Sequence, residues 1–403
     1  MTRLIPLAAG LAAALSFPSM AQMRVALAPP ASGDVAPRHL AGRAVPTPPS
    51  VETEPVQFAW PIDASTPLAR PAPYEAESRE FWATVDGAAL ARGYRVHTTG
   101  PAAVVRISAE PGAATPAFST LQVLHGGRTL SAQAASTARA DAAQLEAAGA
   151  PFPDRTLALQ LRPDLGAGAF DLRMAEARGR YLVHVFEPES PYALHLATPE
   201  TAHLTGDRVR LEARLRTPAS GVSLQRIGAL LTAPDGRTVP AEFRREGDAW
   251  RAEVALPPDA SAVPGLWELH AFAVGRAAAQ PLLRDAKLAL AVAAPTARLG
   301  RAAAVEPAPD GLRFAVPVEA AVEGRYEVRG VLYGTSATGE LVPAAVGHSA
   351  ARLEAGTGAL ELHFEPALLA GLSAPYELRD LELSDQGRNG RLERRALGLR
   401  LSR

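Results

Sequence analysis

Ser349 lies in the segment of the sequence that comes nearest to a nucleophile motif. The run Gly347-His348-Ser349-Ala350-Ala351 is a loose version of the elbow that exposes a catalytic serine between a strand and a helix. That chemistry needs a parallel sheet with helices on both faces, followed by an acid and a histidine later in the chain. Because the neighbouring segments here have strand patterns, we interpret Ser349 as part of a surface turn.

His184, Glu187 and Glu189 carry the imidazole and carboxylate groups that zinc binds. On a strand, His184 points to the face opposite Val183 and Val185. A loop opens at Glu187, so the three side chains need not converge. We therefore expect a solvated strand end at this point.

Asp380, Glu382 and Asp385 could bind calcium through their oxygen atoms, together with Gln386 and Asn389. Their spacing is not that of a calcium loop, which begins with an Asp-x-Asp-x-Asp-Gly run. We expect these side chains to form turns and to pair with nearby arginines. The candidate partners are Arg379, Arg388 and Arg391.

Gly166-Ala167-Gly168 lacks the preceding strand, third glycine and following helix of a dinucleotide site, so we interpret it as a loop. Carboxylate pairs for glycoside hydrolysis are not visible in sequence, because the fold sets their separation. No catalytic, metal-binding or cofactor-binding residue is therefore predicted, and no cofactor.

Aromatic residues matter because sugar-binding surfaces commonly stack sugar rings on aromatic rings. Only 5% of this chain is aromatic. Phe81-Trp82, Trp250 and Trp267 fall in apolar stretches, which favours core packing for them. Exposed tryptophan side chains would favour glycan binding instead.

The N-terminus has the pattern of an exported protein. Thr2 and Arg3 precede an apolar run from Leu4 to Leu15, which is shorter than the roughly 20 residues of a membrane-spanning helix. A small-residue pattern ends at Ala21 and predicts cleavage there. We expect residues 1–21 to be a signal peptide and the mature protein to be periplasmic or secreted, without membrane insertion.

The composition excludes several function classes. The 403 residues include no cysteine, which excludes disulfides and thiolate metal sites, so each domain needs its own apolar core. The formal net charge is -1, so no strong field exists to attract nucleic acid. The length predicts two to four domains.

Residues 22–73 are rich in proline and alanine and have no sustained periodicity. We interpret them as a semi-extended linker, because proline removes backbone donors and keeps its neighbours extended. Phe58, Trp60 and Ile62 could dock on the rest of the protein.

Residues 74–192 combine strand patterns with the one long helical pattern of the chain. Ser131 to Gly149 is rich in alanine and ends at a glycine suited to a C-cap, which predicts a helix of about four turns. We therefore expect an N-terminal α+β domain. The predicted strands are 94–97, 103–108, 121–124, 156–161 and 181–186.

Residues 193–294 and 298–403 have purely β patterns. Val209 to Leu215 alternates apolar and charged residues without a break, which predicts a strand with one buried face. Turn signals recur at short intervals, as at Pro234-Asp235-Gly236. We expect two immunoglobulin-like β-sandwiches, and hence a mainly β multi-domain protein.

Several short segments of the chain together carry a family resemblance. They are Glu80-Phe81-Trp82, Gly87, Gly93, Leu332 to Thr335, Gly339, Gly371 to Tyr376, Leu378, Asp380-Leu381 and Asp385-Gln386. With these segments the chain resembles the bacterial family catalogued as domain of unknown function 4785. The resemblance implies a mixed N-terminal domain followed by immunoglobulin-like domains over nearly all of the mature chain, and it implies no activity or site residue.

Three functions agree with these patterns. The first is an exported binding or scaffold protein without catalytic activity, with an unknown protein or glycan partner. The second is a secreted hydrolase or hydrolase accessory with a site in the N-terminal domain. The third is a glycan-binding module. A pocket with convergent polar groups in the N-terminal domain would favour the second.

Overall fold

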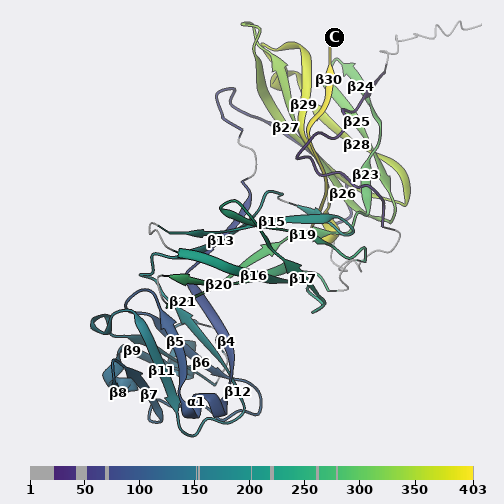
Figure 1. Cartoon of the computed structure of the whole chain (residues 1–403). Coiled ribbons are helices and arrows are strands. Elements are labelled where there is room, and N and C mark those ends of the chain that lie inside the picture. The colour runs from purple at the N-terminus through teal and green to yellow at the C-terminus, as the bar shows by residue number, and fades with distance from the viewer. Residues whose placement is uncertain are drawn as a thin grey trace, which may run out of the picture.

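Three hydrophobic cores divide the chain into three domains that follow one another in an elongated molecule (Figure 1). The computed structural model describes residues 22–41, 52–68, 72–150, 152, 155–200, 202–217, 222–259, 263–277 and 280–402. Strands dominate the described residues and the helices are short. The prediction of a mainly β multi-domain protein is confirmed.

The first domain packs two β-sheets face to face. Its strands are β4 (Glu80–Asp86), β5 (Tyr94–Thr98), β6 (Val104–Ala109), β7 (Leu121–His125), β8 (Arg128–Ser131), β9 (Ser136–Asp141), β10 (Thr156–Leu161), β11 (Gly168–Met174) and β12 (Arg180–Phe186). One sheet has the order β9-β10-β6-β12-β4 and the other β5-β11-β7-β8. Alternate residues such as Val105, Leu159 and Phe170 fill the space between them.

The helices of the first domain are α1 (Gly87–Arg92), α2 (Ala132–Ala135) and α3 (Ala142–Ala147), with a 3₁₀ turn, η1, at Pro163–Leu165. The long helix predicted from Ser131 to Gly149 is wrong, because β9 interrupts it and pairs with β10. The α+β character of this domain is thus limited to short helices. Within the described ranges, no helix is long and apolar enough to cross a membrane.

The second domain is a β-sandwich around Leu211, Ile227 and Trp267. One sheet has the order β18-β19-β15-β13-β3 and the other includes β17-β16-β20-β21, while β14 and β22 pair beside them. The strands are β3 (Tyr74–Ser78), β13 (Ala193–Thr198), β14 (His203–Leu204), β15 (Arg208–Arg216), β16 (Val222–Thr232), β17 (Thr238–Glu242), β18 (Arg244–Glu246), β19 (Ala249–Ala255), β20 (Trp267–Ala277), β21 (Gln280–Leu290) and β22 (Val292–Ala293).

The third domain is a second sandwich, around Phe314, Tyr326 and Leu362. Its sheets are β1-β24-β25-β23, with β28 also on β25, and β2-β27-β26-β29-β30. The elements are β1 (Met23–Ala26), β2 (Val56–Pro61), β23 (Ala297–Leu299), β24 (Ala302–Ala308), β25 (Gly311–Ala320), β26 (Gly324–Thr335), β27 (Leu341–Leu353), β28 (Gly356–Phe364), β29 (Ser373–Asp385), β30 (Gly390–Leu401), η2 (Pro366–Leu369) and η3 (Gln386–Arg388).

The N-terminal segment belongs to the C-terminal domain, so the interpretation of residues 22–73 as a linker needs correction. β1 pairs with β24, and β2 pairs with β27. Both strands lie at sheet edges, where nearby prolines are tolerated because one side of the strand needs no donors. The chain then adds β3 to the second domain, builds the first domain and returns (Figure 1).

One sheet runs through the first two domains. Its order is β17-β16-β20-β21-β4-β12-β6-β10-β9, and the two domains meet where Asp285 of β21 pairs with Glu80 of β4. The first junction therefore includes a backbone pairing between the two domains.

Candidate functional site

Ser349 does not occupy a turn. It lies inside β27 and is buried, so the predicted surface turn is wrong. The neighbouring His348 points to the opposite face. There its Nδ1 lies 2.7 Å from Oε1 of Glu327. Both residues are therefore ordinary strand positions, and the segment is not a nucleophile elbow.

His184, Glu187 and Glu189 do not converge. His184 lies with its Nε2 2.8 Å from Oε2 of Glu80, and this hydrogen bond lowers the pKa of Glu80. Glu189 is exposed, whereas Glu187 is fully buried. The expectation of a solvated strand end is therefore wrong for Glu187.

The acidic residues near the C-terminus each pair with an arginine. Asp385 Oδ2 lies 2.6 Å from Nη1 of Arg388, and Glu382 Oε1 lies 3.0 Å from Nε of Arg391. Asp380 pairs with Arg394, and Arg379 pairs with Glu377 instead. In the part of the chain that the structure describes, no three His, Cys, Asp or Glu residues are grouped to hold a metal ion.

The aromatic residues named from the sequence divide into two kinds. Phe81 and Trp267 are buried in domain cores. Trp82 and Trp250 are half-buried. The expectation of core packing is wrong for Trp82, whose ring packs outside the cores against His270, with ring centroids 4.7 Å apart.

A buried ion pair joins the first two domains at their junction. The side chains of Arg284 and Glu187 are 1% and 0% exposed, and Nη1 lies 2.9 Å from Oε1. Arg284 also donates to the Tyr192 carbonyl and to Ser190 Oγ, at 2.9 and 2.7 Å. Glu187 accepts from the Thr99 hydroxyl at 2.7 Å. Burial lowers the pKa of Arg284, and the charge of Glu187 opposes this effect.

Trp82 packs over the same junction on the outer face of the shared sheet. Its ring contacts His184 of the first domain and His270 of the second. Lys287 Nζ lies 5.2 Å from the ring centroid, within the range of a cation–π contact. The Trp82 backbone N–H donates to Oδ2 of Asp285 at 3.3 Å. Aromatic packing therefore also joins the first two domains on this face.

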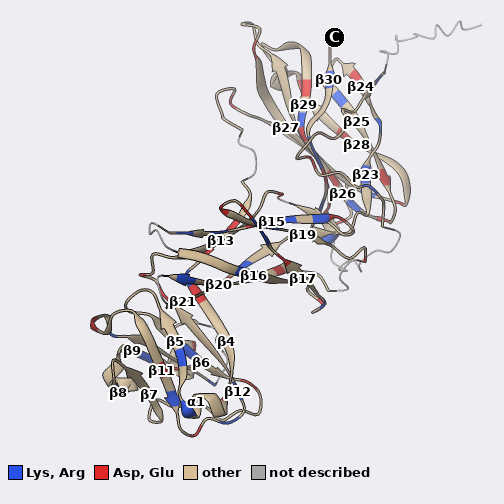
Figure 2. Cartoon of the chain, viewed as in Figure 1, with Lys and Arg blue, Asp and Glu red and all other residues tan. Residues whose placement is uncertain are grey.

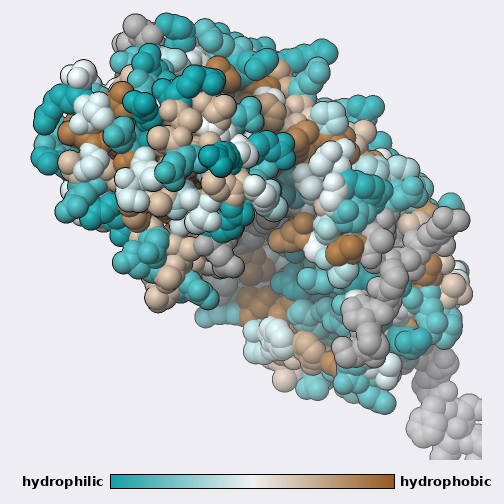
Figure 3. Space-filling model, turned by 90° about the horizontal axis from the view of Figure 1, so that it is seen from below, coloured by the Kyte–Doolittle hydropathy of each residue, from teal (hydrophilic) through white to brown (hydrophobic). Residues whose placement is uncertain are grey.

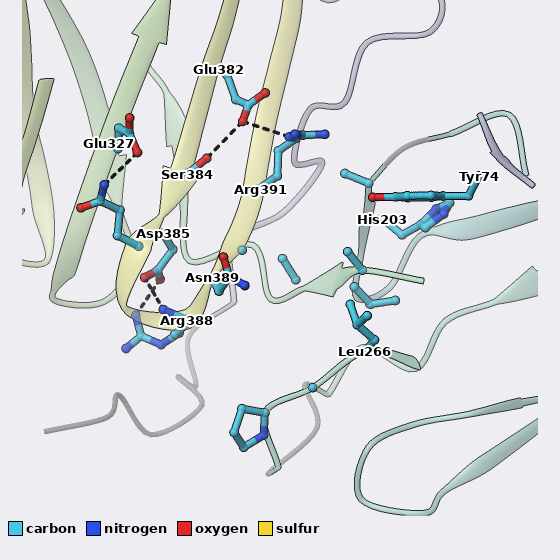
Figure 4. Close-up of a pocket in the computed structure, with 18 residues that line it drawn as sticks. Tyr74, His203, Leu266, Glu327, Glu382, Ser384, Asp385, Arg388, Asn389 and Arg391 are labelled. Carbon is cyan, nitrogen blue, oxygen red and sulfur yellow. Dashed lines mark hydrogen bonds and ion pairs between the residues drawn. The ribbon is translucent and has the colours of Figure 1, made fainter. Parts of the chain in front are cut away.

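The second and third domains are separated by a cleft of about 800 Å³. The third domain supplies a polar wall from β26, β29, η3 and β30 (Figure 4). In this wall Gln386 donates to Oε2 of Glu327 at 2.8 Å, and Asp385 also accepts from the Thr296 hydroxyl at 2.8 Å. Figure 4 shows Glu382 and Arg391 facing the other wall across the opening.

The second domain supplies a more apolar wall. Tyr74, His203 and Leu266 lie on it, opposite the polar wall (Figure 4). Leu266 is 62% exposed. The walls meet near Gly390, where an added Cβ would lie 2.9 Å from that of Ala293. Figure 3 shows that the surface is also hollowed between the domains, with hydrophobic side chains in the hollow.

His203 is an unsatisfied polar group beside the cleft. It is only 4% exposed, and its Nε2 has no hydrogen-bond partner among the described residues. Burial lowers the pKa of His203, and the negative charge of Glu200 opposes this effect. At the edge of the cleft, His203 therefore holds a buried nitrogen without a partner in the described part of the chain.

The N-terminal arm, residues 22–41, crosses the second junction. Val35 exchanges backbone hydrogen bonds with Arg394 of β30, at 3.0 and 2.8 Å. Further along, the ring of His39 lies against Gly206 of the second domain, where an added Cβ would be 2.7 Å from it. The arm therefore contacts both domains that border the cleft.

The first domain has a smaller pocket of about 380 Å³. The Tyr181 hydroxyl at this pocket donates to the Ala114 carbonyl at 2.8 Å and accepts from the Arg178 N–H at 3.2 Å. Glu176 is the one carboxylate, and no histidine occurs, among the described residues that line it. This arrangement does not bring together a proton-transfer pair.

Sequence reasoning found part of the cleft and missed the rest. The acidic cluster at Asp380 to Asn389 was singled out, and most of its members form the polar wall. Tyr74, His203 and Leu266 were missed because they come from separate segments of another domain. No local pattern marks them, and only the packing of two domains brings them opposite the cluster.

The family comparisons cover most of the chain. The N-terminal domain described as "Domain of unknown function (DUF4785)" matches residues 47–187, and the C-terminal domain of the same description matches residues 296–402. No curated protein is significantly similar in sequence.

One of the similar solved structures shows the same fold. A DUF4785 family protein from Legionella pneumophila has a TM-score of 0.71 and 21% identity, over 91% of this chain and 99% of that one. Alpha-2-macroglobulin from E. coli has a TM-score of 0.29 and 14% identity, over 81% of this chain and 20% of that one. With both of its terminal domains matched, this chain belongs to the DUF4785 family.

Proposed function

We propose that this protein is an exported binding protein without catalytic activity and that it holds its ligand in the cleft between the second and third domains. The observation that carries the proposal is the cleft itself. It has one polar and one apolar wall, and its volume of about 800 Å³ is in the range of ligand sites in proteins.

The electrostatics of the cleft support binding over catalysis. Its carboxylates are already held in the polar wall by arginine and glutamine partners, as at Asp385–Arg388 and Glu382–Arg391. Carboxylates paired in this way can orient a ligand through hydrogen bonds, and this binding does not require them to accept a proton from the ligand. Charges of both signs are interspersed over all three domains (Figure 2), so the cleft does not lie in a field of one sign.

Native mass spectrometry tests ligand binding. The purified protein is incubated with a small-molecule extract of the culture, and a bound mass is sought. Leu266→Arg places a charged side chain in the cleft and should abolish the bound mass. Leu230→Arg is the matched control, because Leu230 is also exposed on the second domain but does not line the cleft.

Two outcomes would count against the proposal. One is a bound mass that Leu266→Arg leaves unchanged. The other is turnover of peptide, ester or polysaccharide substrates that purifies with the protein and disappears in Glu382→Gln. The first result would place the ligand outside the cleft, and the second would show that the protein is an enzyme.

Export rests on the sequence pattern of residues 1–21. Cell fractionation followed by intact-mass measurement should find the protein in the periplasm or the medium, beginning at Gln22. A full-length chain in the cytoplasm would contradict export.

A further inference from the structure

Two exposed rings and one half-buried ring cluster on the outer face of the third domain. We define this aromatic patch as Phe58 and Trp60 of β2 and His348 of β27. The ring centroids are 4.8 Å apart for Phe58–Trp60, 5.0 Å for Phe58–His348 and 5.3 Å for Trp60–His348. Phe58 is 40% exposed and Trp60 is 50% exposed. Large aromatic surfaces left in water in this way often mark a binding site.

The strand register links the aromatic patch to the cleft. Ala350 of β27 pairs with Val56 on one side and with Glu327 on the other, and Glu327 lines the cleft. Phe58 and Trp60 follow Val56 at alternate positions on the same face. At about 3.3 Å per residue, Trp60 lies about 13 Å beyond Val56 along the strand. The patch is thus a continuation of the polar wall.

Hydrogen bonds hold this continuation in place. The two oxygens of Glu327 bind different partners, His348 Nδ1 at 2.7 Å and Gln386 Nε2 at 2.8 Å. Gln386 lines the cleft, and His348 belongs to the aromatic patch. One carboxylate therefore orients a ring outside the cleft and an amide inside it. Such fixed side chains lower the cost of ordering on binding.

The strand register also places polar side chains between the cleft and the aromatic patch. Arg329 of β26 pairs with His348 on one side and with Glu382 on the other. Glu382 lines the cleft, so Arg329 lies on the direct path from the cleft to the aromatic patch. Its guanidinium can donate several hydrogen bonds in one plane.

The combined surface suits a ligand with polar edges and apolar faces. The cleft charges are paired with each other, so they offer hydrogen bonds and do not select an ion. Leu266 and Tyr74 offer apolar and aromatic surface opposite them. Sugar rings have this character, since hydroxyl groups surround their edge and C–H bonds cover their faces.

We propose that the ligand of the cleft is a neutral oligosaccharide, which extends from the cleft past Arg329 and stacks on Phe58 and Trp60. This inference rests on the proposed function, because it names the ligand class of the same cleft. It requires that the patch and the cleft bind one molecule together.

Isothermal titration of the purified protein tests the inference. The probes are soluble neutral hexasaccharides built from glucose, xylose, mannose or N-acetylglucosamine. Trp60→Ala and Phe58→Ala should each weaken the tightest-binding hexasaccharide about tenfold, the effect expected from losing one stacked ring. Leu266→Arg should weaken it at least as much.

Phe272→Ala is the matched control. Phe272 is 39% exposed, as much as Phe58, but lies on β20 of the second domain. The control should bind like the original protein. Circular dichroism melts of each variant separate lost binding from lost folding, and Trp60→Tyr should restore part of the affinity because it restores a ring.

The outcomes separate this inference from the proposed function. If Leu266→Arg weakens binding and both ring variants leave it unchanged, the cleft binds the sugar but the patch does not, and the inference is overturned alone. If no hexasaccharide binds while a culture-derived mass still depends on Leu266, the ligand class is wrong. If an extended peptide binds and Trp60→Ala abolishes it, the edge of β2 accepts a strand and the inference is also overturned.

Discussion

The two junctions between the three domains are built in opposite ways. At the first, a sheet continues from β21 into β4, and the buried pair of Arg284 and Glu187 lies beside it. At the second, paired charges line one wall of a cleft of about 800 Å³ and face a more apolar wall. The ion pair of the first junction is almost fully buried, whereas Arg391 and Glu382 at the second junction stay 34% and 18% exposed.

This difference suggests that one junction is rigid and the other is mobile. Separating the buried ion pair would leave a buried charge without its partner, at a high cost in free energy. We therefore expect the first junction to hold its two domains together as one body. Domains whose interface is not large and hydrophobic move relative to each other by default. We therefore expect the first two domains to act as a rigid support, and the third domain to move over the cleft.

The largest expected effect comes from Arg284→Met. It leaves the Glu187 carboxylate buried without its cation, which typically costs about 3–5 kcal/mol. Differential scanning calorimetry should show one shared transition for the first two domains in the original protein. In the variant that transition should move to lower temperature and split in two.

Arg208→Met is the control for Arg284→Met. Arg208 pairs with Glu253, but both side chains are largely exposed, so we expect little change. If Arg284→Met melted like Arg208→Met, the first junction would not depend on its buried pair, and the contrast between the junctions would be lost.

A smaller effect is expected from Trp82→Ala. The half-buried indole contacts His184 and His270 across the first junction, and its loss should destabilise the protein by about 2 kcal/mol in urea titration. Lys287→Met removes the cation above the ring together with its exposed ion pair to Glu268, and should cost about 0.5 kcal/mol. Equal losses in the two variants would show that charge, and not ring packing, holds this face.

The smallest effect concerns the second junction and depends on pH. Burial lowers the pKa of His203, so the folded protein holds this ring neutral. Below about pH 6.5 the unfolded chain takes up a proton there that the folded chain does not, so stability falls as the pH falls. His203→Phe removes this contribution, and its melting temperature should drop less between about pH 7.5 and pH 5.

His363→Phe is the control for the pH series. His363 is only partly buried on the third domain, and its Nε2 donates to the carbonyl oxygen of Asp310 at 2.9 Å. Its variant should keep the pH slope of the original protein. If His203→Phe also kept the pH slope of the original protein, His203 would not contribute to the pH dependence of stability.

Local periodicity predicted most of the strands, because alternation of apolar and polar residues depends on neighbours in sequence. Val209 to Leu215 lies within β15, and Thr156 to Leu161 is β10. The helix predicted for the alanine-rich segment is wrong for the opposite reason. Helix propensity is a weak preference, and the pairing of β9 with β10, which depends on the whole fold, overrides it.

Long-range pairing explains the other misses. The sequence places Phe58 and Trp60 in a linker whose rings could dock on the rest of the protein. They do dock, but as part of β2, which pairs with a strand nearly three hundred residues later, where Phe58 lies opposite His348. Glu187 was expected in water, yet its partner Arg284 lies in another domain. The cleft depends in the same way on two domains, so sequence reasoning found one wall and not the other.

Distance measurements across the two junctions test the contrast most directly. The chain has no cysteine, so introduced cysteines can be spin-labelled at chosen sites. Gln122→Cys with Arg244→Cys spans the first junction, and Arg244→Cys with Glu361→Cys spans the second; all three positions are exposed. Pulsed dipolar spectroscopy should give a narrow distance distribution for the first pair and a clearly broader one for the second. Equal widths, or a broader distribution across the first junction, would contradict the account.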